Sequence, residues 1–220
     1  MEELNNRVPK FDWNKIEHMK EEDISYFLYL EGKSIQSICK IRGLDSHTIQ
    51  KHIIESKIRH RYLVNIRTSK ELIELFRNIP KDEKSKVLLG IDKKFRKELI
   101  DYINNEYGNM TITDKGTAIW IIGELKNESS IGILLKGSVH KAVLVRRMAI
   151  SAMGKINNEK CENALIRALS DENPQVISYA ISSLIKMKSL KAKDRVLELC
   201  GCNKEYIVRL VERYKEEVLE

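Results

Sequence analysis

The C-terminal half of the sequence repeats with a period of 31 residues. The pair Ala-Ile recurs at Ala118, Ala149 and Ala180, and other apolar positions recur in the same register. Two further columns are Val145, Val176 and Ile207, and Leu134, Leu165 and Val196. A period of this length is typical of stacked two-helix units, which bury their apolar faces only against their neighbours. The sequence therefore predicts an α-solenoid over residues 113–220, with the alanine column at the closest approach between adjacent helices.

Composition favours a mostly helical protein that does not enter a membrane. Of the 220 residues, 32% are charged and 6% are aromatic, with 3 prolines and 10 glycines, which suits an all-α rather than a β-rich chain. No apolar run reaches the roughly 18 residues of a membrane span. The acidic start Met1-Glu2-Glu3 is unlike a signal peptide. We therefore expect a cytoplasmic protein.

The four cysteines form no metal-binding or redox motif. Cys200 and Cys202 are close in sequence, but no CxxC pair or nearby histidine accompanies them, and a structural zinc site needs about four ligands. Cys39 and Cys161 lie in helical patterns, where a free cysteine acts as a small buried hydrophobic residue. We predict no metal and no cofactor.

Positive charge is concentrated near the N-terminus. Residues 33–67 contain eight Lys or Arg and two acidic residues, a net charge of +6, whereas residues 1–32 have a net charge of −4. Residues 68–112 and 113–220 carry +1 and +4, within a total of +7. A local positive field of this kind is expected of a surface that binds a polyanion.

The basic segment has the pattern of three short helices. Residues 22–31 end at Gly32, a second pattern runs from Ser34 to Gly43, and Asp45 is a suitable N-cap for a third. A glycine between the second and third helices is the plan of a helix-turn-helix, whose third helix enters the major groove of DNA. The side chains expected to form its core are Phe27, Ile38, Leu44 and Ile49.

The same residues resemble a known module. The runs Glu31-Gly32-Lys33-Ser34-Ile35, Ile38-Cys39, Arg42-Gly43-Leu44, Thr48-Ile49 and His52-Ile53 look like the helix-turn-helix at the C-termini of RecQ-type helicases. They are similar, less closely, to the DNA-binding half of LuxR-type regulators. Cys39 stands where that pattern has Ala, and Ile53 where it has Leu. The resemblance covers about 35 residues and implies nucleic-acid binding without a sequence preference.

Helical spacing places the candidate DNA contacts opposite Ile49 and Ile53. Gln50 is suited to read adenine and Lys51 to reach phosphate or guanine, while the first turn brings side chains and free N–H groups to phosphates or base edges. The predicted contacts on the third helix are Ser46, His47, Thr48, Gln50 and Lys51. Those after it, expected to clamp phosphates, are Arg59, His60, Arg61 and Arg67.

A different interpretation of this module stays open. A helix-turn-helix with a solvated basic face also serves protein contacts alone, because a fold does not determine a function. His52 occupies the histidine position of the pattern but lies three residues from the inward Ile49. We therefore expect His52 to be a partly buried structural residue rather than a DNA contact.

The middle of the chain and the repeats complete the domain plan. Residues 67–112 carry helical patterns broken at Pro80, without the 31-residue repeat, and we expect helices that bridge a helix-turn-helix domain (1–66) to the solenoid and cap its first unit. The segment Val145–Ile156, VRRMAISAMGKI, closely resembles the short HEAT-like repeat also found in phycobilisome lyases. The last helix, from Glu205, has polar residues where another unit would stack, which predicts a cap.

No catalytic residues are predicted in the solenoid. HEAT-like folds include enzymes, but Trp120 lies within an apolar run, which favours core packing, and no Ser-His-Asp set, phosphate loop or HExxH motif is present. Basic side chains could line a groove or could simply be solvated. The candidates for such a surface are Lys136, Lys141, Arg146, Arg147 and Arg167, with Lys191.

These observations predict an all-α protein with an N-terminal helix-turn-helix and a solenoid of HEAT-like repeats. The function expected is non-enzymatic binding of duplex DNA, with the solenoid recruiting a protein partner or extending the contact along the nucleic acid. One alternative is a protein–protein interaction scaffold. A second is a HEAT-like enzyme that repairs or modifies nucleic acid.

Overall fold

The computed structural model describes residues 16–17, 19–60 and 66–220. In these residues there are thirteen α-helices and no β-strand, which confirms the all-α prediction. The chain divides into two compact units, Met1–Arg96 and Lys97–Glu220. The boundary lies within helix α6 (Lys93–Glu106), in the stretch that the sequence predicts to be bridging helices.

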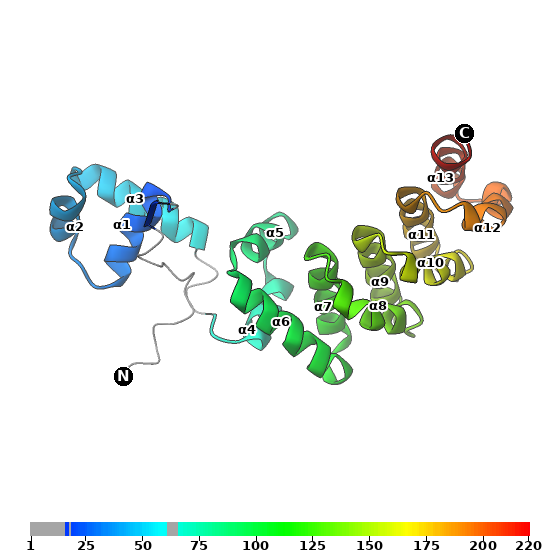
Figure 1. Cartoon of the computed structure of the whole chain (residues 1–220), viewed down its shortest axis with the longest axis horizontal. Helices are drawn as coiled ribbons and strands as arrows, with labels where there is room; N and C mark the ends of the chain where they lie inside the picture. The colour runs from blue at the N-terminus through cyan, green and yellow to red at the C-terminus, as the bar shows by residue number, and fades with distance from the viewer. Residues whose placement is uncertain (1–15, 18, 61–65) are drawn as a thin grey trace. The chain divides into compact units, whose positions relative to one another are not determined.

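Three helices at the N-terminal end form the predicted helix-turn-helix: α1 (Glu21–Leu30), α2 (Ile35–Arg42) and α3 (Ser46–His60) (Figure 1). Gly32 and Gly43 have φ angles of 82° and 65°, in the left-handed region that favours glycine. The Ser34 side chain accepts a hydrogen bond from the N–H of Ser37 and caps α2. The predicted boundaries at Gly32, Ser34 and Gly43 are therefore present.

The core of this module differs from the prediction at one residue. Tyr26 is buried, together with Leu28, Ile38, Ile49 and Ile53, while Leu44 packs at the edge of the cluster. Phe27, expected in the core, is only half-buried. The long helix α3 explains the difference, because its end reaches the face of α1 that carries Tyr26, where the Tyr26 ring stacks on His60 with centroids 6.3 Å apart.

The bridging region contains α4 (Ser69–Asn78), α5 (Lys81–Gly90) and α6. Thr68 caps α4 in a reciprocal box with Glu71, in which each side chain accepts from the other residue's N–H. Pro80 lies directly before α5, as the expected break between helices requires. The buried side chains of α4 are Leu72, Ile73 and Phe76.

The repeats form two layers of helices. The helices of one layer contact one another in succession and are α7 (Ile112–Glu124), α9 (Val143–Ile156), α11 (Pro174–Met187) and α13 (Glu205–Tyr214). The second layer packs against them and consists of the shorter helices α8 (Ile131–Ser138), α10 (Glu162–Ala168) and α12 (Lys193–Leu197). Figure 1 shows this succession from α7 to the C-terminus.

Small residues set the spacing between successive long helices. A Cβ on Gly123 would lie 2.8 Å from the Cβ and 2.9 Å from the Cα of Ala152, and a Cβ on Gly154 would lie 2.7 Å from the Cβ of Ser183. Ala149 is fully buried, and a Cβ on Gly137 of α8 would lie 3.1 Å from its Cβ. The glycines five residues after Ala118 and Ala149 therefore mark a close approach between successive long helices.

The end of the array matches the predicted cap. Ile185, which replaces glycine in the third unit, is buried, and α13 continues as a turn of π-helix (Lys215–Leu219). Glu212 and Lys215 form an ion pair at the surface, and the hydroxyl of buried Tyr214 donates to the carbonyl of Ser189. Polar groups therefore stand where another unit would stack.

We predict that Gly154→Ala destabilises the repeats. The added methyl group would overlap Ser183, and overpacking of this kind costs about 1–3 kcal/mol. Gly132→Ala is the matched control, since a Cβ there meets nothing within 4 Å and replacing a helical glycine by alanine stabilises by roughly 0.5–1 kcal/mol. Thermal unfolding of the full chain measures both.

Adding Ser183→Gly to Gly154→Ala makes room for the methyl group. The double variant should therefore lose less stability than the sum of the two single variants. Equal melting of Gly154→Ala and Gly132→Ala would contradict the close approach of α9 and α11.

Candidate functional site

The outward face of α3 carries the predicted base contacts. Ser46, His47, Gln50 and Lys51 are all exposed. The opposite face of the helix is buried against α1 and α2. Helix α3 therefore presents a row of polar side chains on one side while its other side holds it in the module.

The first turn of α3 is capped from within the protein. The Asp45 carboxylate accepts from the N–H of Thr48 at 3.0 Å and from its hydroxyl at 2.6 Å. These hydrogen bonds lower the pKa of the Asp45 carboxyl below its ordinary value. An anion at this helix terminus would meet the carboxylate of Asp45, and the Thr48 hydroxyl already has a partner. Phosphate contacts are therefore left to the basic side chains.

A polar network joins α3 to α1. The Oδ1 atom of Asp23 lies 2.8 Å from the Ser56 hydroxyl, which donates to it, and 3.0 Å from Nε2 of His60. Ser25 Oγ lies 3.1 Å from Nδ1 of His52. His52 is half-buried, as expected of a structural histidine. His60, predicted to contact phosphate, instead bonds to Asp23, so it orients α3 rather than facing outward.

The predicted basic contacts differ in how they are placed. Lys51 is exposed, and its Nζ lies 3.9 Å from Oε1 of Glu55. A surface ion pair of this kind is weak and restrains the lysine side chain little. Arg67 is exposed, and its N–H donates to Glu71 at 2.7 Å. Arg59 belongs to α3 but its side chain is outside the described part, and Arg61 lies outside the described residues.

The structure adds surface residues that the sequence pattern did not single out. Lys33, Lys40 and Lys57 are exposed basic residues of the same module. Ile54 has an apolar side chain, yet it is 59% exposed. The sequence signal for Ile54 was its spacing of four residues from Gln50, which puts both side chains on one face of a helix.

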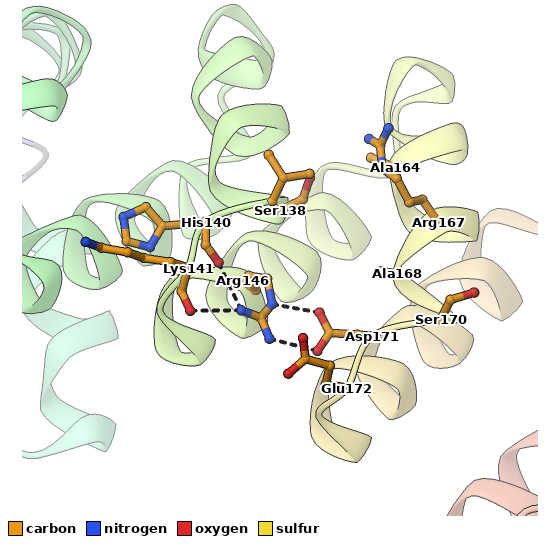
Figure 2. Close-up of a pocket in the computed structure, with 11 residues that line it drawn as sticks. Ser138, His140, Lys141, Arg146, Ala164, Arg167, Ala168, Ser170, Asp171 and Glu172 are labelled. Carbon is orange, nitrogen blue, oxygen red and sulfur yellow. Dashed lines mark hydrogen bonds and ion pairs between the residues drawn. The ribbon is translucent and has the colours of Figure 1, made fainter.

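The repeats contain a polar pocket of about 320 Å³ between the ends of α8 and α10 (Figure 2). Three of the basic residues predicted for the solenoid surface line it, namely Lys141, Arg146 and Arg167. Lys136 is exposed on α8, and Arg147 donates to the side chain of Gln175 at 2.9 Å; neither lines the pocket. Three of the five predicted residues therefore line one pocket, and the other two lie outside it.

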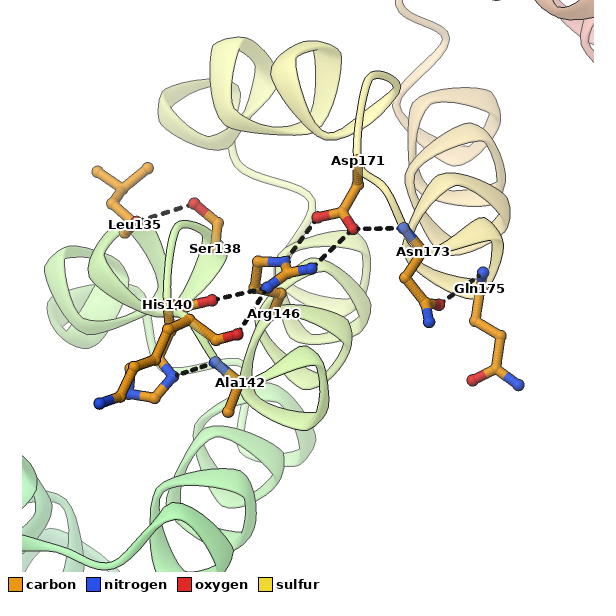
Figure 3. Close-up of polar contacts among 9 residues, drawn as sticks. Leu135, Ser138, His140, Ala142, Arg146, Asp171, Asn173 and Gln175 are labelled. Carbon is orange, nitrogen blue, oxygen red and sulfur yellow. Dashed lines mark hydrogen bonds and ion pairs between the residues drawn. The ribbon is translucent and has the colours of Figure 1, made fainter.

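Arg146 has its hydrogen-bonding groups occupied by the protein. Its guanidinium donates to both carboxylate oxygens of Asp171, at 2.7 and 3.0 Å, and to the carbonyls of His140 and Lys141, each at 3.0 Å. Asp171 also accepts from the N–H of Asn173, which in turn caps α11. Figure 3 shows this chain of contacts from one repeat to the next.

The charge of Arg146 is therefore balanced inside the fold. Burial by itself would raise the pKa of Asp171, but hydrogen bonds from Arg146 and Asn173 and the attraction of the guanidinium lower it. The hydrogen bond to Asp171 raises the pKa of Arg146. Arg167 points away from this pair in Figure 2 and is exposed. Of the three basic residues in the pocket, Arg146 is the one with a structural role.

Neither a metal cluster nor a membrane helix is found in the part of the chain that the structure describes. No three His, Cys, Asp or Glu side chains come together there in a way that could hold a metal ion. None of the helices there is both long and apolar enough to cross a membrane. Cys200 is exposed and Cys161 is buried, where burial raises the pKa of its thiol.

Two known families match separate parts of the chain. A family described as a helix-turn-helix domain matches residues 21–111, and a family described as HEAT repeats matches residues 140–213. No curated protein is similar enough to be counted as a relative. The first match extends past the predicted module into α4–α6. The chain is thus all-α, with a helix-turn-helix-type domain followed by HEAT repeats.

We predict that Arg146→Met costs about 3 kcal/mol of stability, because removing one partner of a largely buried ion pair leaves the other charge unpaired. Asp171→Asn should cost less, since both carbonyl contacts of Arg146 remain. Arg167→Met is the matched control and should change stability little. Urea unfolding of the full chain at neutral pH compares the three variants.

The pH dependence gives a second test. The pKa of Asp171 is lower in the folded protein than in the unfolded chain. The Asp171 carboxylate therefore contributes to the free energy of unfolding above the unfolded pKa of about 3.9, and this contribution is lost as the pH falls through the folded pKa. The stability difference between the natural chain and Asp171→Asn should therefore shrink below about pH 4. A difference that stays constant down to pH 2 would contradict the ion pair.

Proposed function

We propose that this protein binds duplex DNA without catalysing a reaction, with α3 placed in the major groove. The observation that carries the proposal is the outward face of α3, where His47, Gln50 and Lys51 are exposed opposite a buried apolar face. A helix presented in this way is the reading element of helix-turn-helix proteins. The match of residues 21–111 to a helix-turn-helix domain supports it.

The charges around α3 support a nucleic acid over a protein partner. Lys33, Lys40, Lys51 and Lys57 are exposed in this module, and residues 33–67 carry +6. Basic side chains that neutralise phosphates supply most of the non-specific affinity for DNA. The resemblance of this motif to the C-terminal module of RecQ-type helicases points in the same direction.

The repeats would serve a second partner. The long helices carry exposed apolar side chains, with Leu144 of α9 38%, Tyr179 of α11 41% and Tyr206 of α13 45% exposed. A Cβ on Gly116 of α7 would lie 3.6 Å from Leu144 of α9 and 3.9 Å from Met148, so this surface continues between neighbouring helices. Aromatic side chains of this kind are typical anchors of protein–protein contacts.

This apolar surface is also the observation that favours the second candidate function, an interaction scaffold. In that case both units would bind polypeptides, and the basic face of α3 would have no nucleic acid to contact. The two functions differ in one measurable property, the salt dependence of duplex binding.

Binding of the full chain to a labelled duplex should weaken steeply with salt. With roughly 4–6 phosphate contacts, the slope of log affinity against log salt concentration should be about −4 to −5. Fluorescence anisotropy at several salt concentrations measures it. A slope near zero, or no binding at low salt, would exclude the proposal in favour of the scaffold.

Variants of α3 should separate base reading from phosphate contact. Lys51→Ala should weaken binding to all sequences alike and reduce the size of the slope by about 1. Gln50→Ala or His47→Ala should instead change the preference among sequences, by about 1–3 kcal/mol at one base pair for Gln50. Identical behaviour of all three variants would mean that α3 does not read base edges.

A further inference from the structure

Ile54 lies at the centre of the outward face of α3. At about 100° per residue, it is displaced by about 20° from His47, about 40° from Gln50 and about 60° from Lys51 around the helix axis. The buried Ile49 and Ser56 are more than 120° away by the same measure, and both are fully buried. The 59% exposure of Ile54 therefore results from its position on the side opposite the core.

An apolar side chain in this position has a specific counterpart in the major groove. The base edges there present hydrogen-bond donors and acceptors, together with one apolar group, the 5-methyl of thymine. Single exposed isoleucines are common on protein surfaces. This one is surrounded on its own face by the side chains suited to read bases and phosphates, so a ligand that covers those side chains also covers Ile54.

The spacing along the helix agrees with neighbouring base pairs. Ile54 lies four residues after Gln50, a rise of about 6 Å, and successive base pairs are about 3.4 Å apart. An adenine read by Gln50 and a methyl group touched by Ile54 would therefore be one or two base pairs apart.

We propose that Ile54 contacts the 5-methyl group of a thymine and makes the protein selective for an A·T pair one or two base pairs from the one that Gln50 reads. The inference rests on the proposed function, since it requires α3 to occupy the major groove. This contact would distinguish base pairs without a hydrogen bond. Lys51 and Gln50 flank this contact and position the helix over it.

The test replaces thymine by deoxyuridine, which removes the methyl group and keeps base pairing. A preferred duplex is first selected with the full chain from a random pool, and each thymine in it is then replaced in turn. The natural protein should bind about three- to fivefold more weakly when one or two particular thymines are replaced, as expected for the loss of one buried methyl group. Ile54→Ala should bind the thymine and deoxyuridine duplexes equally.

Leu190→Ala is the matched control, because Leu190 is an exposed apolar residue of the repeats, 65% exposed. It should retain the full discrimination between thymine and deoxyuridine. Circular dichroism checks that Ile54→Ala stays folded, and the measurement on the natural protein stands even if that variant unfolds.

The outcomes separate this inference from the function on which it rests. Salt-dependent duplex binding with no effect of any thymine replacement would overturn the role of Ile54 and leave DNA binding in place. Discrimination that persists in Ile54→Ala would assign the methyl contact to another residue and overturn it too. Absence of duplex binding at low salt would overturn both.

Discussion

Burial of one side of α3 fixes the orientation of the helix, so that its other side faces the solvent. Ile49 and Ile53 pack into the core with Tyr26, Leu28 and Ile38, and Asp23 of α1 binds Ser56 and His60 on the same side of the helix. The apolar contacts hold the helix in place, and the hydrogen bonds to Asp23 restrict its rotation. The side chains of Ser46, His47, Gln50 and Lys51 are consequently directed to solvent, where a nucleic acid can reach them.

The repeats are held together in a different way. Glycine faces alanine between α7 and α9 and serine between α9 and α11, and Arg146 joins the second unit to the third through Asp171 and Asn173. This ion pair does not recur along the array, since His140 and Cys202 occupy the column of Asp171. The stack therefore combines a repeated packing contact with an ion pair that is specific to the junction of the second and third units.

Local features of the fold were predictable from the sequence. Gly32, Gly43, Asp45 and Asn173 sit at helix ends as expected, because caps and left-handed turns depend on a few neighbouring residues. The 31-residue period predicted the layered repeats, because equivalent residues occupy the same place in the helices of each unit.

Contacts between distant residues were not predictable in the same way. Asp23 and His60 are 37 residues apart and Arg146 and Asp171 are 25 apart, and no local pattern relates them. Tyr26 and Phe27 are adjacent aromatic residues on α1, and Tyr26 is the one that His60 at the end of α3 covers. The candidate interface was predicted at Gln50 and Lys51, whereas Ile54 was not singled out, because an apolar residue in a helical pattern is normally assigned to the core.

Backbone amide chemical shifts, followed by NMR as an unlabelled duplex is added to the isotope-labelled chain, locate the DNA on the protein surface. Binding through the outward face of α3 predicts that the largest changes fall on residues 46–57, with smaller ones at Lys33 and Lys40. Changes concentrated in residues 112–214, or no change at low salt, would contradict it.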